Sequence, residues 1–220
     1  MTRKGWNRLI IAAAVIVAAP AAAPQLLAFP YSAQVNAHRV RSAQPITPAI
    51  VRAVELADLR VTAGPLGAVR RPDQPIFLTG GGWRWTWLAL SDRGAMALTR
   101  PINDAVIINR TDAAGRDVLN GRALGGRRSL EGVIAHEMTH GSLRTHFGLW
   151  VDVTRPQLLR EGFCDYVAGG GTLSDAEAMA LLRSGTHHPA LPYWQGRKRI
   201  EAEMARPGAS VDRLFAEWRD

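Results

Sequence analysis

The eight residues Val133-Ile134-Ala135-His136-Glu137-Met138-Thr139-His140 decide how the rest of the chain is read. They carry the pattern H-E-x-x-H in a segment whose apolar residues recur at helical spacing without an interrupting proline. Ser129 precedes this segment and is a good N-cap residue, so we expect a helix to begin there. Positions four apart share one face of a helix, so His136 and His140 can present two ring nitrogens to one metal ion.

The metal that this pattern predicts is Zn²⁺, because neutral imidazole in a tetrahedral site suits that ion. Glu137 lies one step round the helix, too far round to be the natural third ligand. It is well placed to take a proton from a water molecule that the metal activates, as the general base of a zinc peptidase does. The alternative is a chance match, which arises in roughly one such chain in a hundred and usually on a polar helix.

Two residues compete for the third ligand position. His146 lies six residues after His140, the spacing of H-E-x-x-H-x-x-G-x-x-H, but Leu143 stands where that pattern needs a glycine for a sharp turn. Glu161 lies on the apolar face of a second predicted helix, where a charged side chain needs a partner. We therefore expect Glu161, rather than His146, to be the third ligand.

The helix that carries Glu161 is predicted to begin at the N-cap Thr154, with Pro156 in its first turn, and to end at Gly169. Asp165 lies one turn after Glu161 on the same face. We expect Asp165 to accept a hydrogen bond from the free N–H of a ligand histidine. The alternative is that Glu161 and Asp165 form an ordinary solvated pair.

At this point the sequence resembles a known family. H-E-M-T-H at 136–140, followed by R-E-G-F-C-D-Y at 160–166, resembles the gluzincin pattern of H-E-x-x-H and then E-G-x-x-x-Y on a second helix. The chain is similar to the peptidase MA-like proteins and, more distantly, to the aminopeptidase N group, although Cys164 stands where alanine is commoner. The aminopeptidase signature G-x-M-E-N is absent, so the resemblance does not imply action on a free N-terminus, and we expect an endopeptidase.

The resemblance also extends to Tyr193-Trp194-Gln195-Gly196, which is similar to the family's Y-x-x-G, whose tyrosine stabilises the oxyanion. Tyr193 is therefore a candidate for the second oxyanion donor beside the metal. His187 and His188, in a loop before a proline, are the rival donors.

The strand expected just before the active-site helix often borders the cleft in gluzincins and pairs with an extended substrate. The resemblance thus implies that Ala105, Ile107 and Asn109 contact a bound peptide. An ordinary core strand is the alternative. Trp83, Trp85 and Trp87 alternate with polar residues and are candidates either to line a substrate groove or to pack beneath the sheet.

Residues 1–30 are expected to lie outside the folded domain, which leaves residues 31–220 as a single zincin-like domain. Arg3, Lys4 and Arg8 precede an apolar run and then small residues, the plan of an export signal. The apolar run continues for about 21 residues, long enough to span a bilayer, so a cleaved signal peptide and a retained membrane anchor both stay open. Either way we expect the domain outside the cytoplasm, in the periplasm or attached to the membrane.

Charge and cysteine content restrict the partners. The net charge is +8, but the basic residues are spread along the chain without an aromatic–basic motif, so nucleic acid is not an expected partner. The expected partner is a peptide or protein substrate. Cys164 is the only cysteine, which excludes an internal disulfide. We expect it to pack in the core, with a role as zinc ligand or reactive thiol as the alternative.

The predicted order is a helix from Pro48 to about Arg60, short strands, the active-site helix, the ligand helix, and helices capped by Ser174 and Ser210. The strands are expected at 38–42, 76–79, 94–98 and 104–109. This order predicts an α+β fold, with a small mixed sheet packed on the active-site helix and a helical C-terminal half.

A second class of function is an envelope binding or scaffold module with a structural or vestigial zinc site, closed by a fourth ligand such as Cys164. Glu137 favours catalysis, because a purely structural site has no use for a carboxylate there.

Overall fold

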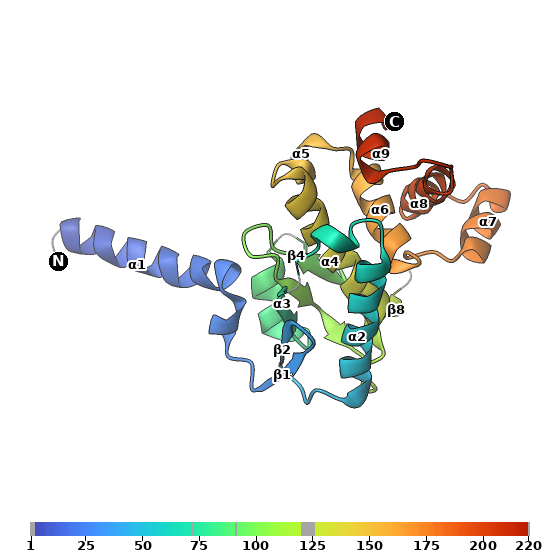
Figure 1. Ribbon diagram of the computed structural model, residues 1–220. Helices are drawn as coiled ribbons and strands as arrows, with labels where there is room; N and C mark the ends of the chain where they lie inside the picture. The colour runs from blue at the N-terminus through green and yellow to red at the C-terminus, as the bar shows by residue number, and fades with distance from the viewer. Residues whose placement is uncertain (1–2, 72, 91, 120–125, 220) are drawn as a thin grey trace.

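The computed structural model describes residues 3–71, 73–90, 92–119 and 126–219, and its first helix extends away from the rest of the molecule (Figure 1). This helix is α1 (Arg3–Ala22), and the short 3-10 helix η1 (Pro24–Leu27) follows it. Leu27 is buried, and the Phe29 ring lies 5.3 Å from the Phe77 ring, so residues 24–29 pack on the domain. None of the described helices is both long enough and apolar enough to cross a membrane.

The centre of the fold is a five-stranded mixed sheet in the order β1-β2-β3-β5-β4. Its strands are β1 (Tyr31–Val35), β2 (His38–Ser42), β3 (Ile76–Leu78), β4 (Ala97–Thr99) and β5 (Val106–Ile108). β2, β3 and β5 run parallel, whereas the two outer strands are antiparallel to their neighbours. The strands expected from β2 to β5 are confirmed, and β1 was missed because its sequence is polar.

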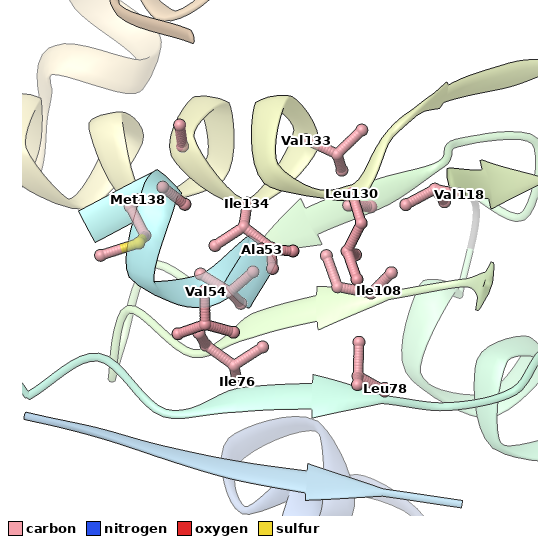
Figure 2. Packing of buried hydrophobic residues seen from close by; sticks show 14 of the residues in the cluster. Ala53, Val54, Ile76, Leu78, Ile108, Val118, Leu130, Val133, Ile134 and Met138 are labelled. Carbon is pink, nitrogen blue, oxygen red and sulfur yellow. The ribbon is translucent and has the colours of Figure 1, made fainter. Parts of the chain in front are cut away.

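The sheet is covered on both faces, as parallel strands require. Ile76, Leu78 and Ile108 face a cluster formed with α2 (Pro48–Ala63) and α4 (Leu130–Phe147), as Figure 2 shows. Phe77 and Ile107 point the other way, toward α3 (Gly82–Ala89). The H-E-x-x-H helix is α4, so the predicted packing of a small mixed sheet on that helix is confirmed, within an α+β fold.

A second, three-stranded sheet leads directly into α4. It consists of β6 (Arg110–Thr111), β7 (Asp117–Leu119) and β8 (Arg127–Ser129). None of these three strands was among those expected from the sequence. The turn between β6 and β7 forms because the Asp112 carboxylate accepts hydrogen bonds from the N–H groups of Arg116 and Asp117.

The C-terminal half is helical, as predicted. Its helices after α4 are α5 (Val151–Thr154), α6 (Gln157–Ala168), α7 (Asp175–Ser184), α8 (Leu191–Met204) and α9 (Val211–Glu217). A short 3-10 helix, η2 (Gly67–Val69), follows α2 earlier in the chain.

Local capping signals located most of these helix ends. Ser174 and Glu177 form the predicted capping box, Ser210 caps α9, and Gly169 ends α6 in the left-handed conformation. The prediction that Thr154 caps α6 is wrong. Thr154 is the last residue of α5, and α6 begins at Gln157, because the extended backbone at Pro156 separates the two helices.

Candidate metal centre and cleft

The two histidines of the H-E-x-x-H pattern share one face in the middle of α4. The hydroxyl oxygen of Ser129 accepts a hydrogen bond from the N–H of Gly132, which confirms the predicted N-cap. The helix then runs unbroken to Phe147. The rings of His136 and His140 lie edge to face with their centroids 5.1 Å apart, so both are directed to the same side of the helix.

The carboxylate of Glu161, on α6, faces both histidines. Its Oε2 lies 3.3 Å from Nε2 of His136, and its Oε1 lies 3.8 Å from Nε2 of His140. Ligand atoms about 2.0–2.1 Å from a tetrahedral zinc ion are roughly 3.3 Å apart, which is the separation of Glu161 Oε2 from His136 Nε2. Two imidazoles and a carboxylate are also ligands that Zn²⁺ commonly takes, so the residues fit this ion.

Behind His136, a carboxylate holds the other ring nitrogen. Nδ1 of His136 lies 2.8 Å from Oδ1 of Asp165, the contact expected from the sequence. The guanidinium of Arg128 donates to the same oxygen at 3.0 Å and to the carbonyl of Gly170 at 3.1 Å. The sequence analysis missed Arg128, because nothing in its local pattern indicates that the residue before an N-cap reaches a second helix.

The electrostatics of this cluster are those of a cation site. Burial alone would lower the pKa of His136, but hydrogen bonds to Asp165 and Glu161 and the charges of these two carboxylates raise it to about 10. Burial alone would raise the pKa of Glu161, but the hydrogen bond to His136 and the charges of His140, His136 and Arg160 lower it to about 2. Ionised Glu161 and Asp165 thus stabilise a positive charge on His136.

Glu137 points into the same region and is held by a residue that the sequence analysis missed. The hydroxyl of Thr99, the last residue of β4, lies 2.6 Å from Oε2 of Glu137 and 2.8 Å from its main-chain oxygen. Since Thr99 is 38 residues away in the chain, only the docking of β4 against α4 reveals the contact. The hydroxyl fixes one carboxylate oxygen of Glu137.

These residues line one cleft with a volume of about 760 Å³. Its floor is α4 with His136, Glu137 and His140. One wall is the segment 94–99, which includes β4, and the opposite wall is α6 with Glu161 together with Tyr193 from α8.

Ala105, Ile107 and Asn109, which were predicted to contact a substrate, do not line the cleft. β5 lies inside the sheet between β3 and β4, so its residues are buried and none of these three lines the cleft. β4 instead ends the sheet and forms the cleft wall. The tryptophans Trp83, Trp85 and Trp87 belong to α3 and do not line the cleft either.

Tyr193 lies at the cleft, whereas its two rivals do not. The Tyr193 hydroxyl accepts a hydrogen bond from Nε2 of Gln157 at 3.1 Å. His187 and His188 are absent from the residues described as lining the cleft, and Nδ1 of His188 accepts a hydrogen bond from the N–H of Ala190. The structure therefore brings Tyr193 to the metal-site cleft and leaves both histidines outside it.

Two glycines explain how Tyr193 reaches this position. A Cβ atom on Gly162, next to Glu161, would lie 2.8 Å from the carbonyl carbon of Gly196 and 2.9 Å from the nitrogen of Arg197. A Cβ atom on Gly196 would lie 2.9 Å from the carbonyl oxygen of Leu158. The glycines of E-G-x-x-x-Y and Y-x-x-G thus let α6 and α8 meet backbone to backbone.

His146 is not part of the cluster. α4 continues past Leu143 without the turn that a third histidine ligand would need, and Nε2 of His146 lies 2.7 Å from Oδ1 of Asp212 on α9. This geometry disfavours His146 as a ligand, as the leucine in the turn position predicted.

Cys164 competes with Glu161 for the position of third metal ligand. It is buried in the core, as expected, yet its sulfur and a nitrogen of each of His136 and His140 lie within 4.8 Å of one another. Burial and the charges of the surrounding carboxylates raise the pKa of the Cys164 thiol, whereas a bound metal would lower it. The Glu161 carboxylate lies 3.3 Å and 3.8 Å from the two Nε2 atoms, so Glu161 and Cys164 are both candidates for the third ligand.

Together these features describe an α+β protein with a His-His-Glu cluster, a flanking carboxylate and a buried glutamate in one cleft. No protein-family model, curated protein or solved structure matches the chain.

Proposed function

We propose that this protein is a zincin-like, zinc-dependent peptidase that hydrolyses internal peptide bonds outside the cytoplasm. The observation that carries the proposal is the approach of the Glu161 carboxylate to Nε2 of both His136 and His140, with Asp165 behind His136 and Glu137 beside it. Two imidazoles and three carboxylates that are largely buried together form a set that a bound cation would stabilise.

In this proposal His136, His140 and Glu161 hold the ion and Asp165 orients the His136 ring. When bound, zinc supplies Lewis-acid chemistry, which polarises a carbonyl group and acidifies a water molecule. Glu137 accepts the proton of the attacking water and later delivers it to the leaving amine, so the proton is returned to the products. The Tyr193 hydroxyl donates a hydrogen bond to the developing oxyanion.

β4 is the segment best suited to hold the substrate. It ends the five-stranded sheet, so no described strand pairs with its outer edge, and the cleft lies along it. An extended peptide can add to such an edge through main-chain hydrogen bonds, which bind a chain with little regard to its side chains. The proposed substrate is therefore an unfolded or extended peptide segment. The N-terminal segment is proposed to direct the domain out of the cytoplasm or attach it to a membrane.

A second candidate function rests on Cys164. Its sulfur is close enough to the histidines to close a structural zinc site, as in a binding or scaffold module. In that case the ion would have no open position, and Glu137 would have no role.

Paired variants separate the two functions. We expect Glu137→Gln to keep stoichiometric zinc and to lose cleavage of a generic peptide library, because only the proton acceptor changes. Cys164→Ala should keep both zinc and activity. If Cys164→Ala loses the metal, or if the parent protein binds zinc and cleaves no peptide in the library, the structural site is correct instead.

A further inference from the structure

α3 has apolar side chains on opposite faces, which is unusual for a short surface helix. Trp85 and Leu88 are buried against the sheet, and they account for one face. Trp83 and Trp87 lie four positions apart on the other side of α3, where Trp83 is 57% exposed, and Leu90, which ends the helix, is 55% exposed. A helix that is apolar all round is normally covered on all sides. Among the described residues only one face of α3 is buried, and Trp83 on the other face is exposed.

Two further exposed apolar residues are tied to the same helix. Arg84 donates from Nε to the carbonyl of Leu27 at 3.0 Å and from Nη2 to that of Ala28 at 2.9 Å, which fixes η1 and its exposed Leu26 beside α3.

On the other side, the Arg100 guanidinium donates to the carbonyl of Leu88, which ties the turn carrying Ile102 to α3. Ile102 is 82% exposed. The neighbouring Asn103 donates to the carbonyl of Ala22, the last residue of α1, at 2.8 Å. We call this set of exposed residues the apolar collar: Leu26, Trp83, Trp87, Leu90 and Ile102.

α1 ends beside the apolar collar and, like it, exposes apolar side chains. It extends clear of the domain in Figure 1 and exposes Trp6, Ile10, Ile11 and Val15. The first turns of the chain carry Arg3, Lys4 and Arg8. A helix with exposed apolar residues thus ends beside the elements that carry the apolar collar.

We propose that the apolar collar and α1 together bind the surface of a lipid bilayer that contains anionic lipid. Tryptophan has an apolar body and a polar N–H, so it is most stable at the boundary between acyl chains and headgroups. The guanidinium of Arg84 lies 4.6 Å from the Trp83 ring centroid and 5.6 Å from that of Phe29, which places a cation among these rings at headgroup level. The basic start of α1 and the net charge of +8 complement anionic headgroups.

This inference goes beyond hydrolysis and stands without it, because none of the five residues of the apolar collar lines the cleft. It assigns a face of the catalytic domain itself to the membrane, in addition to the N-terminal helix. The domain would then be held against the bilayer in one orientation rather than tethered loosely to it.

Site-specific fluorescence on the full chain tests the proposal. Cys164 is fully buried, so an environment-sensitive label can be attached selectively to Leu90→Cys or Ile102→Cys, with exposed Met179→Cys on α7 as the control. On vesicles of equal parts phosphatidylcholine and phosphatidylglycerol, we expect emission at positions 90 and 102 to shift to the blue and emission at 179 to stay unchanged. Vesicles of phosphatidylcholine alone should bind less protein.

Vesicle flotation supplies a second measurement. Replacing Trp83 and Trp87 by serine should reduce vesicle binding by about tenfold or more, since each ring loses its apolar burial. A matched double variant, Met179→Ser with Leu182→Ser, removes exposed apolar residues of α7 and should bind like the parent. Thermal unfolding establishes that all variants fold.

Three outcomes would overturn the proposal. The protein could fail to float with vesicles. It could float while the labels at 90 and 102 stay in water, in which case α1 binds alone. The labels could also shift without vesicles as protein concentration rises, in which case a second copy of the chain covers the apolar collar.

Discussion

Nδ1 of His136 lies 2.8 Å from Oδ1 of Asp165, while Nε2 of the same ring faces the carboxylate of Glu161 at 3.3 Å. Asp165 thus fixes which nitrogen is directed toward the proposed metal. We expect Asp165→Ala to weaken zinc affinity by about 10- to 100-fold, the usual cost of losing such a partner. Competition with a chromophoric chelator measures the affinity. Asp212→Ala is the matched control, because it removes a hydrogen-bonded carboxylate from His146 on the same helix and should leave the affinity unchanged.

The third ligand can be tested by metal content. Glu161→Ala should lose zinc, because only two protein ligands would remain, whereas His146→Ala should retain it. Elemental analysis of the purified variants gives the stoichiometry. Equal losses in both variants would contradict the gluzincin-type ligand set.

Thr99 should affect turnover without affecting the metal. Its hydroxyl is within hydrogen-bonding distance of the Glu137 carboxylate, so Thr99→Val leaves that carboxylate less firmly oriented. We expect kcat to fall by about tenfold, which corresponds to about 1.4 kcal/mol, with zinc content unchanged. Thr99→Ser keeps the hydroxyl and should recover most of the rate. A serine variant as slow as the valine variant would point to packing of β4 instead.

Tyr193→Phe tests the oxyanion donor. The variant should keep its zinc and lose at least about tenfold in kcat, and a full loss of the donor is worth roughly 10²–10³. Steady-state kinetics on a single cleavable peptide provide the measurement. If the phenylalanine variant is as fast as the parent while His187→Ala or His188→Ala is slow, the histidine loop would have to move into the cleft during turnover.

A buried ion pair outside the cleft predicts a dependence of stability on pH. Burial alone would raise the pKa of Asp58, but hydrogen bonds from His38 and Asn36, with the charges of His38 and Arg70, lower it overall. The folded-state pKa is therefore below the unfolded value of about 3.9. The stabilisation is fully present above that value and is lost as the pH falls through the folded pKa.

The corresponding variant is Asp58→Asn. It should have a lower Tm than the parent at neutral pH, and the difference should shrink as the pH falls below about 4, where the parent carboxylate becomes protonated. Calorimetry across this range measures the effect. Arg52→Gln, which disrupts an exposed ion pair with Glu55, is the control and should change Tm little at any pH.

Signals that act within one or two helical turns located most of the elements. Ser129, Ser174 and Ser210 cap the helices that they were expected to cap, since the side chain and the N–H groups that it accepts from are neighbours in the chain. The same reasoning placed Glu161 and Asp165 on a helix face that could meet His136, and they do meet. That they hold zinc stays a prediction.

What the sequence could not supply was the order of strands in the sheet. β4 and β5 are both short and apolar, and nothing local indicates which of them ends the sheet. This explains why Ala105, Ile107 and Asn109 were assigned to the cleft in place of the residues of β4. Thr99 and Arg128 were missed for a related reason: each acts on a residue more than thirty positions away.

The contact of Gly162 with Gly196 limits how closely α6 and α8 can approach, because main chain touches main chain there. Rearranging side chains cannot bring the two helices closer at this end of the cleft. An inhibitor group directed toward Tyr193 should therefore meet a wall that does not close further around it.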